Sequence, residues 1–393
     1  MAGRPPARSV RGSGHLLTGD SGPPLWTVTR AMLSAPAANA AFGYFYALDL
    51  LRGLAALGIL FWHYSHFFAV GPVIVPHDPA DYPFYREFWL FYEHGGNAVQ
   101  LFWLVSGFTL STVYTRRPQS GRTFLVHRFA RLYPLHLITL LAVVVLQWAA
   151  VRSLGEWLIY GNNDLPHFVD QLFLLSGWGP NIRFSFNGPI WTVSVELLIY
   201  GIFWALLPRL FGTGVVGPLL VALLGLWLSR FGPFQHIFQG IFYFFVGCGL
   251  YPVFLACREH GSARLLAVAL PLLAAFAALV RWHAIGACSG LLLVGLVLAA
   301  SFVDGERHGL VARRAMKWIG DNTYGVYLWH VPIQLSILLL AGLAGWSKAL
   351  FLSPPFFLLF FALVLVVSRT SFLLVERPCR AWLKDRLAGG RGW

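Results

Sequence analysis

Long apolar segments follow one another along most of the chain, and they constrain its fold more than any other feature. Most are close to the roughly 20 residues that an α-helix needs to cross a hydrocarbon core of about 30 Å. Only 11% of the 393 residues are charged, whereas about 25% are charged in a soluble domain. In lipid, backbone polar groups must be satisfied within the segment itself, which favours helices. The sequence therefore predicts an all-α integral membrane protein with about ten transmembrane helices, over residues 45–69, 95–114, 132–151, 189–208, 214–230, 236–257, 264–281, 284–303, 322–343 and 350–372.

The distribution of Lys and Arg predicts the topology. With the N-terminus in the cytoplasm, 21 of the 29 Lys and Arg residues fall on the cytoplasmic side and six on the exterior side. Cytoplasmic loops carry such an excess, so both termini are expected in the cytoplasm. The same short basic loops explain the net charge of +13, which therefore indicates no nucleic-acid partner.

The chain divides into three parts by composition. Residues 1–43 are rich in Gly, Pro, Ser, Ala and Arg without periodicity, which is typical of a disordered cytoplasmic tail. Residues 44–380 are expected to form the membrane domain, and 381–393 a basic cytoplasmic tail. The long exterior loops, about 70–94 and 152–188, mix acids, His, Asn, Gly and aromatics. They either line a site for a sugar-like ligand or merely connect spans.

The first apolar segment carries Asp49, Arg52, His63 and His66. Arg52 and His63 are 11 residues apart, about three helical turns, so they would share a face within about 20° and lie about 16 Å apart along the axis. Ionisable groups at membrane depth usually face the bundle interior or a wet cavity. His63 could remove a proton from a hydroxyl, take an acyl group as a nucleophile, or simply pack in the bundle. His63 and His66 share a face without a third ligand, so no metal site is predicted.

Three basic side chains are candidates for binding an anionic donor. Asp49 and Arg52 are three residues apart, so Asp49 could either neutralise Arg52 or hold it ready for an anion. Arg128 and Arg131 begin the third span, where paired arginines suit phosphate but also serve as membrane anchors.

Two later segments carry further polar groups. Glu196 lies in the apolar fourth span, close to Trp191 and Ser194, and could orient a histidine, pair with an arginine or bind a hydroxyl. Tyr327 and His330 are one turn apart in the ninth span. Together with Ser194 and Trp191 they are expected to form either a structural polar cluster or part of an acceptor site.

Seven motifs in this order resemble the membrane-bound acyltransferase family 3, which includes bacterial O-acetyltransferases of surface glycans. The resemblance covers residues 45 to about 380. The motifs are D-x-x-R-G-x-A-A at Asp49–Ala56, the Arg52–His63 spacing, FWLVSGF at Phe102–Phe108, R-x-x-R-L-Y-P at Arg128–Pro134, W-T-x-S-x-E at Trp191–Glu196, TYGVYLWH at Thr323–His330, and VERP at Val375–Pro378.

The resemblance implies transfer of an acyl group, acetyl above all, from cytoplasmic acyl-CoA to a hydroxyl of an extracytoplasmic glycan or lipid-linked saccharide. It implies essential roles for Arg52 and His63, and roles for Arg128, Arg131 and Glu196. No tightly bound cofactor is expected, because acyl-CoA is a cosubstrate. The protein would act alone or with a separate extracytoplasmic transfer partner. The alternative interpretation is a transporter or flippase of a glycan-related solute, although the sequence shows no evident internal repeat.

Overall fold

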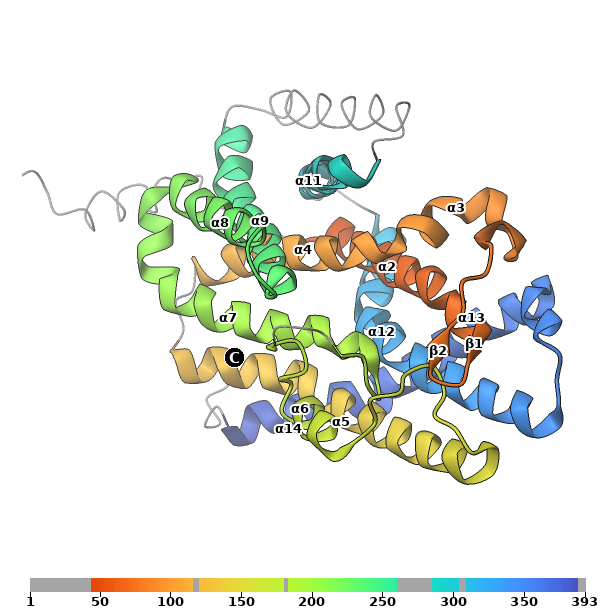
Figure 1. The fold of residues 1–393 in the computed structure, drawn as a ribbon. Helices are drawn as coiled ribbons and strands as arrows, with labels where there is room; N and C mark the ends of the chain where they lie inside the picture. Colours follow the sequence, from red (N-terminus) through yellow and green to blue (C-terminus); the bar gives the residue numbers. More distant parts are fainter. Residues whose placement is uncertain (1–43, 116–119, 180–182, 260–284, 304–308, 388–393) are drawn as a thin grey trace, which may run out of the picture. The chain divides into compact units, whose positions relative to one another are not determined.

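The computed structural model describes residues 44–115, 120–179, 183–259, 285–303 and 309–387, which are almost entirely helical (Figure 1). Within these ranges one short antiparallel hairpin, β1 (Ala69–Val70) and β2 (Val73–Ile74), interrupts the helices. The helices are α2 (Tyr46–Trp62), α3 (Tyr85–His94), α4 (Ala98–Tyr114), α5 (Gly121–Leu154), α6 (Leu165–Leu172), α7 (Trp191–Leu210), α8 (Val216–Leu228), α9 (Gln235–Glu259), α11 (Ile285–Val303), α12 (Leu310–Ala344), α13 (Pro354–Ser371) and α14 (Arg377–Leu387). Short 3-10 helices occupy His63–Phe68, Pro79–Asp81, Gly95–Asn97, Gly188–Ile190, Phe211–Thr213 and Lys348–Leu352.

Five helical stretches of the described residues are long and apolar enough to cross a membrane. They are Gly121–Leu154, Gly188–Leu207, Gln235–Cys257, Leu310–Ala344 and Pro354–Leu387. The prediction of an all-α, multi-pass membrane protein is therefore confirmed. Each expected apolar segment within the described ranges coincides with a helix, and the segment at 264–281 lies outside them.

Several helix ends differ from the predicted ones. The first segment is α-helical only to Trp62, and continues as the 3-10 helix His63–Phe68 before the hairpin. Helices α5 and α12 begin 11 and 12 residues before the predicted spans at 132 and 322, because their first turns are polar yet helix-forming. Their internal Pro134 and Pro332 do not end them, as is common in membrane helices.

The C-terminal end also differs from prediction. The VERP motif was expected to end the last span, but α13 passes through a π-helical stretch, Phe372–Glu376, directly into α14. Pro378 does not end this helical run, which it enters directly after the π-helical stretch, since prolines and π-bulges both bend a helix without necessarily stopping it. Residues 381–387, expected to be tail, are thus helical, and α14 packs against α5.

Helix α2 lies at the centre of the packing. It packs against α12, α4 and α3, and its apolar residues contribute to both large buried clusters of the protein. The polar side chains of α2 therefore face neighbouring helices, as expected for ionisable groups at membrane depth.

Glycines allow α4 and α9 to approach closely. A Cβ on Gly107 would lie 1.9 Å from the carbonyl oxygen of Phe244, and one on Gly247 would lie 2.1 Å from that of Leu104. Small residues thus bring the backbones of α4 and α9 together, as in other membrane helix pairs.

We expect Gly107→Ala to destabilise the protein by about 1–3 kcal/mol, because the methyl group must push two backbones apart. The matched control is Gly201→Ala in α7, where a Cβ would meet nothing within 4 Å. Thermal unfolding in detergent should show a lower midpoint for the first variant alone. Equal midpoints would mean that α4 and α9 are not held at this separation.

Candidate active site

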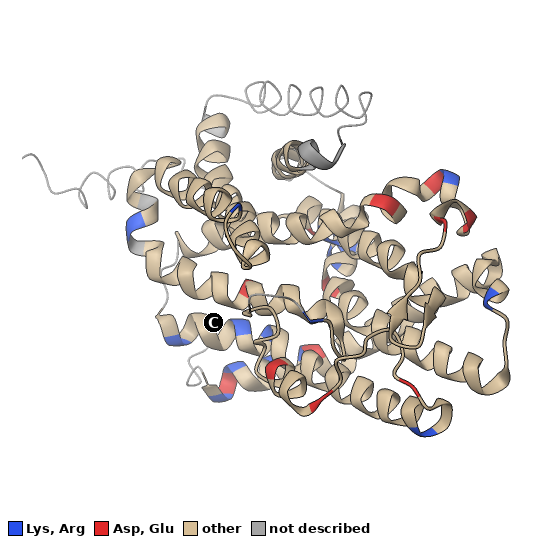
Figure 2. Cartoon of the chain, in the orientation of Figure 1, with Lys and Arg blue, Asp and Glu red and all other residues tan. Residues whose placement is uncertain are grey.

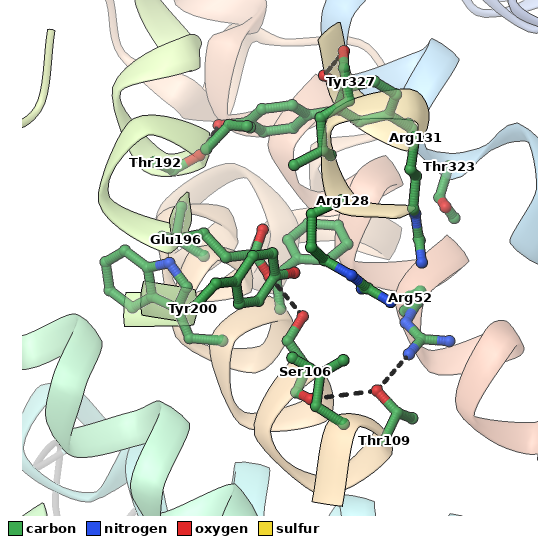
Figure 3. Close-up of a pocket in the computed structure, with 17 residues that line it drawn as sticks. Arg52, Ser106, Thr109, Arg128, Arg131, Thr192, Glu196, Tyr200, Thr323 and Tyr327 are labelled. Carbon is green, nitrogen blue, oxygen red and sulfur yellow. Dashed lines mark hydrogen bonds between the residues drawn. The ribbon is translucent and has the colours of Figure 1, made fainter. Parts of the chain in front are cut away.

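A cavity bordered by α2, α4, α5, α7 and α12 gathers most of the predicted donor residues. It encloses about 740 Å³ of empty space, part of it open to solvent. Figure 3 shows the guanidinium groups of Arg52, Arg128 and Arg131 pointing toward one another on one side of it. The other labelled lining residues are Ser106, Thr109, Thr192, Glu196, Tyr200, Thr323 and Tyr327. We call this space the arginine cavity.

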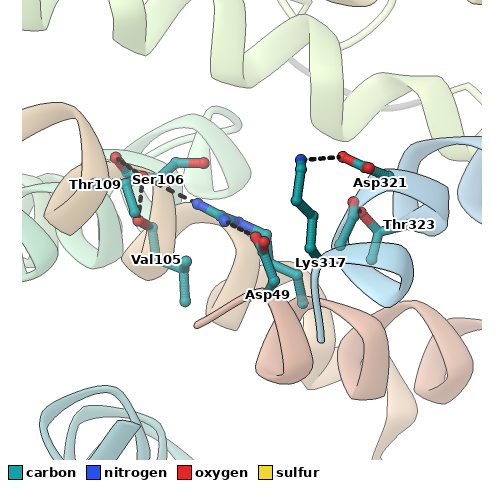
Figure 4. A network of polar contacts seen from close by, with 9 residues as sticks. Asp49, Val105, Ser106, Thr109, Lys317, Asp321 and Thr323 are labelled. Carbon is teal, nitrogen blue, oxygen red and sulfur yellow. Dashed lines mark hydrogen bonds and ion pairs between the residues drawn. The ribbon is translucent and has the colours of Figure 1, made fainter. Parts of the chain in front are cut away.

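Arg52 is held from two sides. Its Nη1 lies 2.8 Å from Oδ1 of Asp49, which is 3% exposed, and its Nη2 donates to Oγ1 of Thr109 at 3.1 Å (Figure 4). Thr109 in turn donates to the carbonyl of Val105 at 2.8 Å. Asp49 therefore forms an ion pair with Arg52 and at the same time fixes its direction. The two predicted roles of Asp49 are compatible, because the paired Arg52 still lines the cavity.

The carboxylate of Asp49 also affects the pKa of Tyr44, which lies just before α2. Burial, and then the negative charge of Asp49, raise the pKa of Tyr44 above its ordinary value. Tyr44 therefore stays protonated and neutral near pH 7.

Arg128 and Arg131 face the cavity from α5. The guanidinium of Arg128 lies 5.5 Å from the ring centroid of Tyr200 and 5.9 Å from that of Phe124, which favours a cation–π contact. Its Nε is buried without a hydrogen-bond partner among the described residues. A membrane anchor would direct its guanidinium to the lipid headgroups, so the geometry favours the anion-binding alternative for this pair.

Glu196 lies in the arginine cavity, away from His63. Its Oε1 accepts hydrogen bonds from Oγ of Ser106 and from Oη of Tyr200, both at 2.6 Å. Of the three predicted roles, the geometry matches hydroxyl binding.

A second polar cluster lies where α2 ends. Nδ1 of His63 is 2.9 Å from Nε2 of His330, and the two rings are stacked with centroids 5.0 Å apart. His66 stacks on His63 from another side, at 4.6 Å. Gln334 bridges the pair, because its Nε2 donates to the His63 carbonyl at 2.7 Å while its Oε1 lies 2.9 Å from Nδ1 of His66. We call these four residues with Tyr160 the histidine cluster.

The hydrogen-bond pattern defines the tautomer of His66. Because Gln334 donates through its amide nitrogen to a carbonyl, its oxygen must face a donor, so Nδ1 of His66 carries the proton. Nε2 of His66 then accepts from Oη of Tyr160, 3.1 Å away. Both ring nitrogens of this buried histidine are satisfied, so it is not free to act as a base.

The tautomer of His63 depends on its partner. His330 is fully buried, and its Nδ1 has no hydrogen-bond partner among the described residues. Either ring can therefore be the donor in the hydrogen bond between His63 and His330. When Nδ1 of His63 is the donor, Nε2 of His63 carries the free lone pair. His63 is partly exposed, unlike the other two histidines, so this nitrogen has room to react.

Tyr327 stands between the two sites. It lines the arginine cavity, and its ring centroid is 6.1 Å from that of His330. Its hydroxyl is bound to the carbonyl of Pro189 and to Oγ1 of Thr192, both at 2.6 Å. The arginine cavity and the histidine cluster are therefore separated by a single aromatic side chain.

Two predicted acceptor residues lie elsewhere. Oγ of Ser194 accepts from the backbone N–H of Gly177 at 3.0 Å, and Trp191 packs edge-on against Trp103 and His236. Both therefore hold α7 to its neighbours rather than joining the histidine cluster. No group of three or more His, Cys, Asp or Glu within the described residues could hold a metal ion.

Sequence reasoning missed several residues of these sites. Thr109, Tyr200, Tyr160 and Gln334 are uncharged and carry no spacing signal, so only tertiary packing shows their position. His66 was considered as a metal ligand alone. On α14, Arg380 lies close enough to Arg128 and Arg131 for their charges to repel. Arg380 was not predicted as a site residue, because the last span was expected to end at 372.

Comparison with known proteins identifies the family. Residues 45–370 match the profile of the acyltransferase domain family known as acyltransferase 3. The chain belongs to this family. The predicted resemblance is thereby confirmed, and the seven motifs all fall in or beside the matched range.

Three relatives are similar over parts of their length. The chain is 38% identical over 108 residues to the acyltransferase MdmB of Streptomyces mycarofaciens, a match that covers 27% of either chain. It is 26% identical over 319 residues to the exopolysaccharide production protein ExoZ of Rhizobium meliloti (strain 1021), covering 72% of this chain and 89% of ExoZ. It is 36% identical over 176 residues to protein 2 in the picA locus of Rhizobium radiobacter, covering 40% of this chain and 80% of that protein. No solved structure matches the chain.

Proposed function

We propose that this acyltransferase moves an acyl group, acetyl above all, from cytoplasmic acyl-CoA to a hydroxyl of an extracytoplasmic glycan or glycolipid. One observation carries the proposal. A single helix, α2, presents Arg52 to the arginine cavity and ends at His63 in the histidine cluster. The name of ExoZ, an exopolysaccharide production protein, supports a glycan as the acceptor.

The arginine cavity fits the phosphates of the donor. Three guanidinium groups share one space, while among the nearby carboxylates Asp49 pairs with Arg52, Glu196 accepts hydrogen bonds from two hydroxyls, and Glu376 lies close enough to interact with Arg131. Like charges gathered in this way repel unless an anion neutralises them, and arginine pairs bind phosphate in bidentate geometry. Arg52, Arg128 and Arg131 would hold the diphosphate of CoA. The thioester would then extend past Tyr327 toward His63.

His63 would act through the lone pair of Nε2. As the glycan oxygen attacks the thioester carbonyl, its proton passes to Nε2 of His63, and His330 stabilises the imidazolium through the Nδ1 hydrogen bond. The C–S bond breaks, and the departing thiolate takes the proton from Nε2 to give free CoA and the ester. The same nitrogen could instead attack the thioester first, so that the hydroxyl resolves an acyl-imidazole.

The proposed orientation places ten spans in a bacterial inner membrane with both termini in the cytoplasm. Figure 2 shows Lys and Arg on α14 and on the adjoining part of α5, which pack together at the end that bears Arg128. Gathering of basic residues at one end supports a cytoplasmic face there. Arg52 then faces the donor side, and His63 the acceptor side.

Purified protein in proteoliposomes tests the proposal. We expect free CoA to form from acetyl-CoA only when oligosaccharides released from bacterial exopolysaccharide are present, with matching acetyl ester on the sugar by mass spectrometry. The alternative, a transporter or flippase, predicts movement of the oligosaccharide across the bilayer without any release of CoA.

A further inference from the structure

An open groove borders the histidine cluster and shares Tyr160 with it. It is formed by the β1–β2 hairpin and by two stretches of the loop between α5 and α7, and it encloses about 730 Å³ including open solvent. Its lining includes Pro72, Val73, Tyr160, Asn162, Arg183 and Phe184. The arginine cavity and this groove share no lining residue.

The groove has an aromatic floor with polar edges. The rings of Tyr160 and Phe184 are stacked, with centroids 5.6 Å apart and planes at 24°. Phe184 is 44% exposed, and Asn162 is anchored by a hydrogen bond from its amide to the Phe184 carbonyl. An exposed aromatic face beside amide and guanidinium donors suits a pyranose ring, which has apolar C–H faces and a rim of hydroxyls.

The backbone that carries Tyr160 is strained and firmly held. Ile159 has φ of +65°, a conformation that β-branched residues rarely adopt. The buried side chain of Gln147 binds both the N–H and the carbonyl of Leu158, at 3.1 and 2.8 Å. The Ile159 N–H donates to the Gly71 carbonyl oxygen at 2.9 Å. A strained backbone conformation that several hydrogen bonds hold in place is typical of functional positions.

Tyr160 connects this groove to the reacting histidine. Its ring forms part of the groove, while its hydroxyl, on a side chain that is 7% exposed, donates to Nε2 of His66. His66 stacks on His63 and shares Gln334 with it. A substitution of Tyr160 is therefore expected to affect His63 through the Tyr160–His66 hydrogen bond and the stacking of His66 on His63.

We infer that this groove binds a sugar ring of the acceptor, with the exposed ring of Phe184 as its seat and Tyr160 as the residue that supports Phe184 and positions the histidine cluster. The inference rests on the proposed function and adds the acceptor site to it. The sugar ring would lie on Phe184, which stacks on the buried Tyr160, and Asn162 and Arg183 would contact its hydroxyls. A hydroxyl of the seated sugar is then presented on the His63 side of the protein.

Two substitutions separate the two roles of Tyr160. Tyr160→Ala removes the ring on which Phe184 stacks, so Phe184 loses its fixed position, and it should raise the KM for exopolysaccharide-derived oligosaccharide about tenfold, with the KM for acetyl-CoA unchanged. Tyr160→Phe keeps the floor but loses the hydrogen bond to His66. It should keep the oligosaccharide KM and lower kcat several-fold, with a shifted pH profile, because His66 is freed to exchange its proton. Phe173→Ala, an exposed aromatic of the same long loop, is the control and should change neither constant.

A binding measurement separates this inference from the proposed function. Without acyl-CoA, the same oligosaccharide should give saturation-transfer NMR signals with wild-type protein and with Tyr160→Phe, and weaker ones with Tyr160→Ala. An unchanged oligosaccharide KM and unchanged NMR signals in Tyr160→Ala would overturn the groove as the acceptor site, even if CoA turnover proceeds. Absence of CoA turnover in wild type, with binding retained, would overturn the proposed function and leave the groove as a sugar site.

Discussion

His63→Ala is expected to lower the rate of acyl transfer by about 10²- to 10⁴-fold, the usual contribution of a general base. Alanine removes Nε2 of His63, the nitrogen that we propose as the general base. The measurement is CoA release from acetyl-CoA in the presence of acceptor oligosaccharide. His94→Ala, which alters a histidine packed on Trp89 in α3, is the matched control and should retain wild-type activity. Wild-type turnover by His63→Ala would show that the reaction takes place elsewhere.

Variants of His330 refine this prediction. His330→Gln keeps an acceptor for Nδ1 of His63 in its amide oxygen, whereas His330→Ala keeps none. If His330 orients His63, the glutamine variant should retain much more kcat than the alanine variant, with equal KM for acetyl-CoA. An equal loss of kcat in both variants would indicate that His330 contributes packing alone and does not orient His63.

Arg52→Gln is expected to raise the KM for acetyl-CoA by about 10- to 100-fold, the loss of a charge-assisted hydrogen bond to phosphate. It should also destabilise the fold by about 3–5 kcal/mol, because Asp49 would be left buried and unpaired. Kinetics with varied acetyl-CoA and thermal unfolding in detergent measure the two effects separately.

The double variant Asp49→Asn with Arg52→Gln separates stability from donor binding. Removing both charges should restore most of the unfolding midpoint, since no unpaired carboxylate remains. The KM for acetyl-CoA should stay high. Recovery of the KM together with the midpoint would mean that Arg52 has a structural role alone.

The helices could be predicted from apolar segment length, because lipid leaves the backbone few alternatives. Their ends could not. Oγ of Ser120 accepts a hydrogen bond from the Thr123 N–H and so caps the N-terminus of α5. The helix therefore begins in polar turns that precede the apolar segment. Likewise, the π-helical stretch before α14 depends on packing against α5, which no local pattern indicates.

The site was predictable as far as one helix determines it. Arg52 lies within α2, and His63 directly follows its last residue and begins a 3-10 helix. Their spacing in the sequence therefore sets the distance between them. Their partners could not be predicted in the same way. His330 is 267 residues from His63, and Thr109 is 57 residues from Arg52. Only tertiary packing brings these pairs together.

Glu196 illustrates the limit of motif reasoning. A carboxylate in an apolar span predicts a buried polar partner, and the structure supplies two hydroxyls. Which partner it would have was open, because an arginine or a histidine satisfies the same physical requirement. Ser194 and Trp191 share its motif but face Gly177 and Trp103, since successive helix positions point in different directions.

The most direct test of the central claim places donor and acceptor on opposite sides of the membrane. In the proteoliposome assay, acetyl-CoA is supplied only on the face where a C-terminal tag is open to protease, and the oligosaccharide is confined to the other face. We predict acetylated oligosaccharide and a matching amount of free CoA, because Arg52 and His63 serve opposite ends of α2. Acetylation that occurs only when both substrates share one face would contradict the account.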